Sequence, residues 1–179
     1  MARLRGSYRV GDLTERFSCG AGPLGWRYTS TTDLGDTLDL TVDEDGRVRR
    51  VQAQFDGWDV RGGTTGPEVL WVRGEDEHRA IAAGFTGVSP AFDLATARLL
   101  NLGVGESAKV TLVALTDPVG AARTVHHGWA RTAGPEPEVD RYEVADLDTG
   151  SRWVLHVSAQ VLVSREGERP AHLVALDHP

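Results

Sequence analysis

The alternation of apolar and polar residues over positions 151–164 constrains the fold more than any other feature of the sequence. Apolar side chains recur at every second position, as at Trp153, Leu155 and Val157, and polar residues such as His156 stand between them. Because successive side chains of a β-strand point to opposite faces, this pattern predicts one long strand with a single buried face. A mainly β fold is therefore expected.

Shorter segments with similar alternation, or with β-branched and aromatic residues, follow one another along the chain. The turn sequence Asp148-Thr149-Gly150 joins residues 141–147 to the long strand and predicts a hairpin. The alternation is interrupted between Val48 and Val51, where the apolar residues change from even to odd positions, and this predicts a β-bulge or an early strand end. Further strands are expected at residues 26–32, 38–42, 48–55, 58–61, 69–73, 108–115, 123–131 and 172–176, with a loop at 62–67.

One segment carries the start and stop signals of a helix. Ser89 can cap it, and Pro90 suits the first turn because the amide hydrogen that proline lacks would have no partner there. Between Phe92 and Leu102 apolar residues recur at spacings of three and four, and Gly103 lies just beyond. A single helix over residues 92–102 is therefore predicted.

The number of expected elements predicts one domain over residues 1–179, in which residues 1–13 are loosely ordered. Residues 75–83 fit a short helix or a strand equally well. Roughly nine strands, without a linker or a repeat, indicate one antiparallel sheet. Such a sheet twists and curls. The expected fold is therefore mainly β, a curved antiparallel sheet that forms a half-barrel or open barrel around one helix.

The charge balance argues against a nucleic-acid partner. Acidic residues outnumber basic ones by 26 to 19, the net charge is −7, and Lys109 is the only lysine. Neutralising the phosphates of a nucleic-acid backbone needs a clustered basic face, which this sequence lacks. Without a run of 18 apolar residues or the apolar segment of a signal peptide, neither a transmembrane span nor export is expected. Cys19, the only cysteine, excludes an internal disulfide and agrees with a cytoplasmic location.

Motifs of catalysis and metal binding do not fit their context. The glycines of residues 20–25 satisfy a bare dinucleotide-binding pattern, but no strand–helix–strand unit surrounds them, so a loop is the better interpretation. His126 and His127 are adjacent and on a strand would point to opposite faces, so they cannot chelate one metal together. We expect no metal and no cofactor, and assign no catalytic residue. The aspartates that remain as general-base candidates are Asp56, Asp59, Asp93 and Asp146.

Five tryptophans stand on expected strands, and each has an arginine close by in the sequence. In one interpretation the tryptophans fill the core of a curved sheet while the arginines decorate the opposite face. In the other they line an apolar hollow whose rim arginines hold an anionic head group or stack on the rings. The candidate ligand-binding residues are Trp26, Trp58, Trp71, Phe85, Phe92, Trp129 and Trp153, with Arg27, Arg61 and Arg73 as the rim.

Several short motifs follow one another in the order of these elements. They are Gly25-Trp26-Arg27-Tyr28, Asp56-Gly57-Trp58, Arg61-Gly62-Gly63, Ser89-Pro90-Ala91-Phe92 and residues 142–150. Through these motifs the chain resembles, over residues 17–176, an uncharacterised family from GC-rich bacteria that has no assigned activity. Its layout also resembles lipid carriers of the lipoprotein-localisation type and domains proposed to bind glycolipids, in which a curved antiparallel sheet wraps around helices and leaves an apolar cavity.

The architecture and the resemblance imply non-catalytic binding of a hydrophobic or amphipathic small molecule, such as a lipid, glycolipid or acyl compound, in an aromatic-lined cavity. Two alternatives stay open. A small β-barrel cyclase or isomerase acting on an apolar substrate would need a buried carboxylate or histidine inside the cavity. A structural or regulatory interaction module would pair through an edge strand, form a dimer and contain no cavity.

Overall fold

The computed structural model describes residues 3–55, 57–115 and 123–177. Within these ranges the chain forms fifteen strands and one helix, α1 (Pro90–Leu100). The strands are β1 (Leu4–Val10), β2 (Leu13–Gly22), β3 (Gly25–Thr32), β4 (Thr37–Val42), β5 (Val48–Phe55), β6 (Trp58–Thr65), β7 (Glu68–Arg73), β8 (Asp76–Ile81), β9 (Gly84–Thr86), β10 (Ser107–Ala114), β11 (Arg123–Thr132), β12 (Val139–Asp146), β13 (Arg152–Ser158), β14 (Val161–Gly167) and β15 (Ala171–Asp177).

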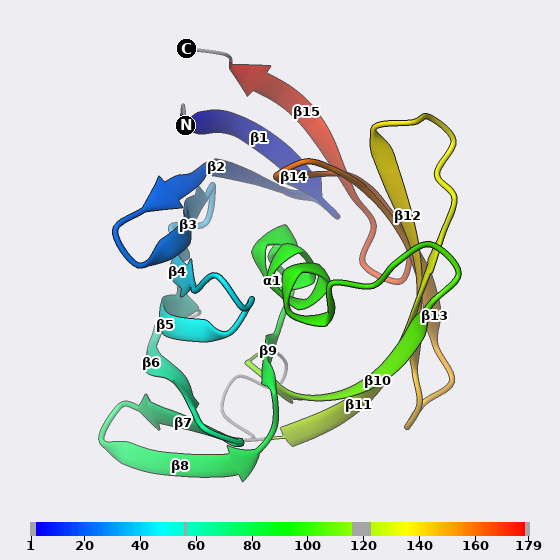
Figure 1. Cartoon of the computed structure of the whole chain (residues 1–179). Helices are drawn as coiled ribbons and strands as arrows, with labels where there is room; N and C mark the ends of the chain where they lie inside the picture. The colour runs from blue at the N-terminus through cyan, green and yellow to red at the C-terminus, as the bar shows by residue number, and fades with distance from the viewer. Residues whose placement is uncertain (1–2, 56, 116–122, 178–179) are drawn as a thin grey trace.

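All these strands belong to one curved sheet that is not closed into a barrel. Their spatial order runs from β8 back to β1, continues with β15, and returns step by step to β9, so the edge strands β8 and β9 are not paired with each other. The pairings are antiparallel, apart from the parallel pair of β9 and β10. Figure 1 shows the sheet curving around α1. The expected mainly β fold around a single helix is confirmed.

The N-terminal segment is a central strand, whereas the sequence analysis expected loose order there. β1 pairs with β2 over its whole length and with β15 on its other side, and so joins the two halves of the sheet. Tyr8 is fully buried, and its hydroxyl accepts a hydrogen bond from the backbone N–H of Leu162 at 3.0 Å. A Cβ at Gly6 would lie 2.3 Å from the carbonyl oxygen of Ala175. Because the neighbouring backbone leaves no room for a side chain at this position, the strand has glycine where an apolar residue would have marked it in the sequence.

The single long strand expected over residues 151–164 is wrong, because the segment forms the two strands β13 and β14. Ala159 and Gln160 make the turn between them, and Ala159 has a φ of 49°. Non-glycine residues rarely adopt a positive φ, so the sequence carries no ordinary turn signal here. Val157 and Leu162 pair across the hairpin and share a face. In the sequence, however, apolar residues occupy the odd positions from 153 to 163 without interruption, and this unbroken alternation conceals the turn.

The loop expected at residues 62–67 is wrong for residues 62–65, since β6 continues to Thr65, and only residues 66–67 form the turn to β7. The glycines of β6 are required inside the sheet. A Cβ at Gly62 would lie 2.5 Å from the carbonyl oxygen of Leu70, and one at Gly63 would lie 2.6 Å from that of Arg49. Glycine within a strand often marks such a close approach of a neighbouring chain. Of the two possibilities for residues 75–83, the structure forms a strand, β8.

Local signals predict the β4–β5 hairpin and the start of α1 correctly. The strand register shifts between Thr41 and Val42, and Arg49 is the extra residue of the expected bulge. Ser89 caps α1 and accepts a hydrogen bond from the backbone N–H of Ala91 at 3.3 Å. The helix ends before the predicted position, because Asn101 already adopts the left-handed conformation that terminates many helices.

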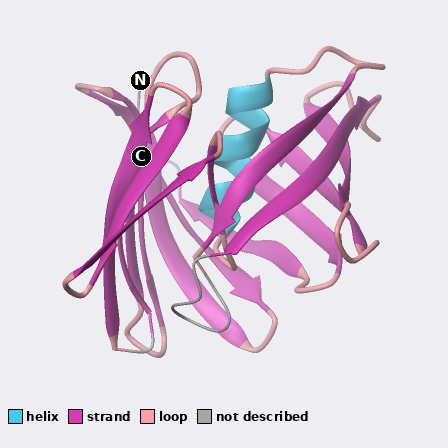
Figure 2. Ribbon diagram, turned by 90° about the horizontal axis from the view of Figure 1, so that it is seen from below, coloured by secondary structure: helices cyan, strands magenta, loops and turns pink. Residues whose placement is uncertain are grey.

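α1 lies in the hollow of the sheet and is buried on nearly all sides. Residues 90–97 are all buried, including the polar residues Asp93 and Thr96. Figure 2 shows the helix between two flanks of strands. The rings of Tyr8 and Phe17 stack beside it, with centroids 4.5 Å apart. Within the described ranges, no helix is long and apolar enough to cross a membrane.

Candidate functional site

The structure places most of the predicted aromatic residues in the packed core around α1. Trp153 is half-buried, and Trp58 is 42% exposed at the end of the sheet. Trp71 packs edge-on against Phe85, with ring centroids 6.5 Å apart. The buried members of the set are Trp26, Trp71, Phe85, Phe92 and Trp129. In the hollow, these side chains occupy the space that the sequence analysis considered for an apolar ligand.

The three predicted rim arginines do not converge on one site. Arg27 donates two hydrogen bonds to Asp39, at 2.9 and 2.8 Å, and these bonds raise the pKa of its guanidinium. Arg61 forms an ion pair with Asp59 at 3.0 Å. The guanidinium carbon of Arg73 lies 3.7 Å from the ring centroid of Trp58. Each arginine is thus engaged by a neighbour of its own.

A polar pocket opens instead between the first turn of α1 and strands β10–β14. We call it the mouth pocket, and its volume is about 350 Å³. Its wall combines apolar side chains of the sheet with carboxylates, arginines and one histidine. Its charged and aromatic polar residues are Asp93, Arg123, His127, Asp146, Trp153, Arg165, Glu168 and Arg169. Asp93 and Asp146 are two of the four general-base candidates from the sequence.

His127 on β11 is the histidine among the described residues that line the mouth pocket. It is 6% exposed, and its ring meets the ring of Trp153 edge to face, with centroids 5.1 Å apart. Among the described residues, neither His127 Nδ1 nor Trp153 Nε1 has a hydrogen-bond partner. Burial lowers the pKa of His127, although Asp146, directly opposite on β12, favours the charged form. The imidazole is therefore neutral at pH 7.

The neighbouring His126 provides a contrast. It is exposed on the other face of the sheet, and its Nδ1 lies 3.1 Å from a carboxylate oxygen of Asp148. The predicted opposite orientation of the two histidines is confirmed. Of the two, only His127 lines the mouth pocket.

Two of the pocket carboxylates are held in fixed positions. Burial acts to raise the pKa of Asp146, but the backbone N–H groups of Thr149 and Asp148 donate to this carboxylate and keep its pKa below the usual value. Arg165 donates to Asp93 at 2.7 Å, and both residues are buried. Burial nevertheless raises the pKa of Asp93 above its usual value. The mouth pocket is therefore rigidly lined on the side of the helix.

Arg165 also anchors the start of α1 to the sheet. In addition to Asp93, its guanidinium donates to the carbonyl oxygen of Val88 at 2.9 Å and to that of Arg169 at 2.7 Å. A second anchor comes from β2, where the buried Glu15 accepts a hydrogen bond from the Ser89 hydroxyl at 2.7 Å. Burial raises the pKa of Glu15. Side chains from both halves of the sheet thus fix the helix end that forms one wall of the pocket.

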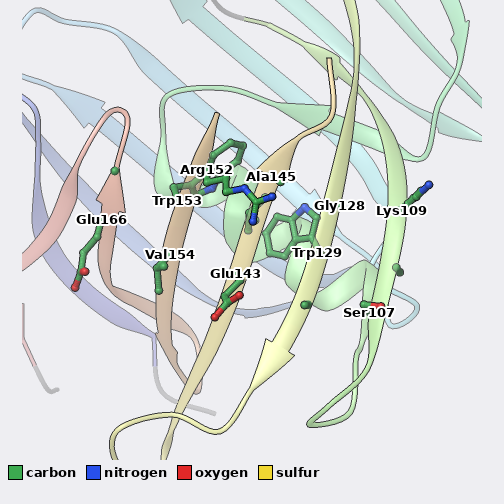
Figure 3. Close-up of a pocket in the computed structure, with 14 residues that line it drawn as sticks. Ser107, Lys109, Gly128, Trp129, Glu143, Ala145, Arg152, Trp153, Val154 and Glu166 are labelled. Carbon is green, nitrogen blue, oxygen red and sulfur yellow. The ribbon is translucent and has the colours of Figure 1, made fainter. Parts of the chain in front are cut away.

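A shallow groove of about 790 Å³ lies on the other face of β10–β14. Figure 3 shows its residues spread over these neighbouring strands. Exposed Glu143 and Arg152 alternate along their strands with the inward-facing Val144 and Trp153, so the groove belongs to the outer face of the sheet. Its floor consists of Gly128, Ala130 and Ala145. Trp129 and Trp153 contribute to this floor from below and do not form an aromatic wall there.

Cys19, Asp59 and His156 do not line the mouth pocket. Burial raises the pKa of the Cys19 thiol to about 11, so this buried cysteine is uncharged at pH 7 and a poor nucleophile. His156 contacts the Ser164 hydroxyl at 3.0 Å. Asp59 is engaged by Arg61, and Asp56 lies outside the described residues. No group of histidine, cysteine and acidic side chains suited to a metal ion occurs in the described part of the chain.

The burial of His127 was not predicted, although the sequence carries a signal for it. Alternate residues of β11 point to the same face of the sheet, and on its inner face the buried residues are Val125, His127 and Trp129. A polar residue between two inward-facing apolar residues indicates a buried polar group. The sequence carries no comparable signal for Arg165. The register shift opposite His156 and Val157 changes which alternate residues of β14 point inward, so simple alternation does not place Arg165 on the inner face.

Comparisons with known proteins support the fold and leave the function open. No family model matches the chain, and no curated protein matches it. Its fold is similar to the crystal structure of a DUF1089 family protein from Pseudomonas aeruginosa, with a TM-score of 0.58 and 16% sequence identity. The match covers 93% of this chain and 90% of that chain. At this identity the likeness concerns the arrangement of the sheet and helix alone.

Proposed function

We propose that this protein binds an amphipathic small molecule without chemical change, and that the polar head of the molecule enters the mouth pocket. The observation that carries the proposal is the pair His127 Nδ1 and Trp153 Nε1, two buried polar atoms without partners among the described residues, on side chains that line the same pocket. Leaving a buried polar group without a hydrogen bond costs about 1–3 kcal/mol. A ligand that supplies these bonds recovers this free energy.

The charges of the pocket favour an uncharged, hydroxyl-rich head group. Three carboxylates (Asp93, Asp146 and Glu168) and three arginines (Arg123, Arg165 and Arg169) line the pocket, so its charges balance. Arg165 neutralises Asp93, backbone amides hold Asp146, and Glu168 accepts a hydrogen bond from the Ser151 hydroxyl at 3.0 Å. A ligand hydroxyl can both donate and accept, which suits these groups better than an added full charge. The ring of Trp153 offers an apolar surface beside them. A sugar-like head on a glycolipid or similar molecule combines these properties.

The size of the pocket limits what enters it. A volume of about 350 Å³ is at the lower end of the roughly 300–1,000 Å³ range of small-molecule sites. The hollow beyond it is filled by α1 and by core residues such as Phe92. A long acyl chain therefore extends away from the pocket, and only the head is enclosed.

Titration calorimetry with octyl glucoside below its micellar concentration tests the proposal. His127→Phe keeps the aromatic contact with Trp153 but removes the imidazole nitrogens, and His126→Phe is the matched control on the outer face. We expect about tenfold weaker binding by H127F, equal to roughly 1.4 kcal/mol, and unchanged binding by H126F. Equal affinity of wild type and H127F would contradict the proposal.

An acid–base enzyme that acts at the same site is the second candidate. The observation in its favour is that His127 is neutral, buried and close enough to Asp146 to sense its charge. A neutral imidazole can take a proton from a bound substrate. Incubating an extracted ligand with wild type and H127F, and following its mass and chromatographic retention, separates the two functions. Conversion by wild type alone would establish the enzyme in place of the carrier.

A further inference from the structure

A second cleft lies at the opposite end of α1, where the proposed function places nothing. Its volume is about 1030 Å³. Residues 21–26, 43–46 and 159–160, which include the three turns β2–β3, β4–β5 and β13–β14, surround the last turn of the helix there. Arg98 projects from that turn, and its guanidinium carbon lies 4.6 Å from the ring centroid of Trp26. We call this space the Arg98 cleft.

The Arg98 cleft contains hydrogen-bond donors without acceptors. A guanidinium carries five N–H donors. In the described part of the chain, the guanidinium of Arg98 contacts the Trp26 ring, and the nearby Cys19 thiol, whose pKa of about 11 leaves it uncharged at pH 7, supplies no oxygen acceptor. Trp26 Nε1, on a side chain only 7% exposed, also has no partner among the described residues. Two donor side chains in contact with each other thus share the same unmet requirement.

The charge of Arg98 is also incompletely compensated. Burial lowers the pKa of its guanidinium, and Cys19 opposes this only in part. Its position in the last turn of α1 is favourable for a cation because of the helix dipole. That interaction accounts for a positive charge at this place. It does not provide partners for the N–H groups.

The acidic residues of the β4–β5 turn do not fill this role. Asp43 accepts hydrogen bonds from the backbone N–H groups of Asp45 and Arg47 and pairs with Arg49 at 2.9 Å. Glu44 and Asp45 are exposed at the tip of the turn. Charges in such positions are strongly screened by water and salt. An external anion therefore meets the guanidinium with limited competition from these carboxylates.

We propose that the Arg98 cleft binds an anionic oxygen group, the carboxylate or phosphate of a small molecule. Arginine recognises both groups through paired N–H donors, and stacking on Trp26 holds its plane in place. The indole N–H of Trp26 supplies a further donor. The site is separate from the mouth pocket, since Asp93 in the first turn of α1 lines one and Arg98 in the last turn lines the other.

Nuclear magnetic resonance of the full chain provides the test, with inorganic phosphate and hexanoate as probes at low ionic strength. The protein has five tryptophans, so its indole N–H signals are few and Trp26 can be assigned with a Trp26→Phe variant. We expect saturable shifts of the Trp26 indole and Arg98 Nε–H signals with at least one probe. Saturation by phosphate alone would identify a phosphate site, and saturation by hexanoate alone a carboxylate site.

Two variants and one matched control separate specific binding from general charge effects. Arg98→Gln is expected to weaken binding at least about tenfold, the loss typical of a charge-assisted hydrogen bond. Arg27→Gln changes the net charge equally but lies in an ion pair with Asp39 outside the cleft, so its binding should match wild type. W26F keeps the aromatic surface and removes one donor, so its affinity should fall less than that of R98Q. Absence of a saturable shift with both probes, or equal binding by wild type and R98Q, would overturn the proposal.

Discussion

Replacing Arg165 with Met should destabilise the protein strongly, because the change leaves a buried carboxylate without its cation. Arg165 and Asp93 are 5% and 7% exposed, and their side chains meet at 2.7 Å. Removing one partner of such a pair costs about 3–5 kcal/mol. For a domain of this size each kcal/mol lowers Tm by about 2–4 °C. The R165M variant should therefore melt roughly 6–20 °C below wild type.

The pH dependence of the loss identifies its cause. Burial already raises the pKa of Asp93, and Arg165 counteracts this rise, so the pKa should rise further in R165M. A carboxyl whose folded-state pKa is raised binds more protons when folded than when unfolded. Its stabilisation is present below the unfolded pKa and is lost as pH increases toward the folded pKa. The deficit of R165M relative to wild type should therefore be smaller at pH 4 than at pH 7.

A double-mutant cycle completes this test. In D93N/R165M no buried charge remains, so the double variant should lose less stability than the sum of the single variants, by about 0.5–3 kcal/mol. Urea unfolding followed by circular dichroism measures all four proteins. A loss below about 1 kcal/mol for R165M, the level of an exposed ion pair, would refute the argument. Strict additivity in the cycle would refute it as well.

Three further predictions concern the packing and the second anchor of α1. Because burial raises the pKa of Glu15, wild type should lose stability as pH rises above the unfolded pKa of this carboxyl. E15Q has no carboxyl to titrate there, so its Tm, measured by thermal melts from pH 4 to 7, should change less with pH than the Tm of wild type. G62A should cost about 1–3 kcal/mol in urea unfolding, because its Cβ meets a backbone oxygen at 2.5 Å, while G22A, with its nearest atom at 3.5 Å, should be tolerated. W129A should cost about 3–5 kcal/mol, since this side chain is 2% exposed, and a loss under 1 kcal/mol would show that it is not core.

Features that depend on residues close in the sequence could be predicted. Ser89 and Pro90 start α1 through short-range capping, and the parity slip after Val48 marks a bulge. Features that depend on the approach of distant chains could not. Gly62 is needed because β7 approaches its backbone closely, and Gly6 because β15 does. The composition around each glycine gives no sign of these distant strands.

The site shows the same division. The opposite orientation of His126 and His127 follows from strand geometry alone. The anchoring of Asp93 by Arg165 joins residues that are 72 positions apart, so only the fold brings them together. The five tryptophans were correctly placed on strands, but composition does not distinguish a tryptophan that fills a core from one that lines a cavity. Burial of Trp26, Trp71 and Trp129 settles only their packing.

Native mass spectrometry of the protein purified from its own or a related host tests the central claim, that the mouth pocket holds the head of a small molecule. Wild type and H126F should carry an adduct above the 19.3 kDa chain that organic extraction releases, and H127F should carry little or none. Bare chain mass for all three proteins, unchanged after addition of octyl glucoside or extracted lipids, would contradict the account and favour an interaction module.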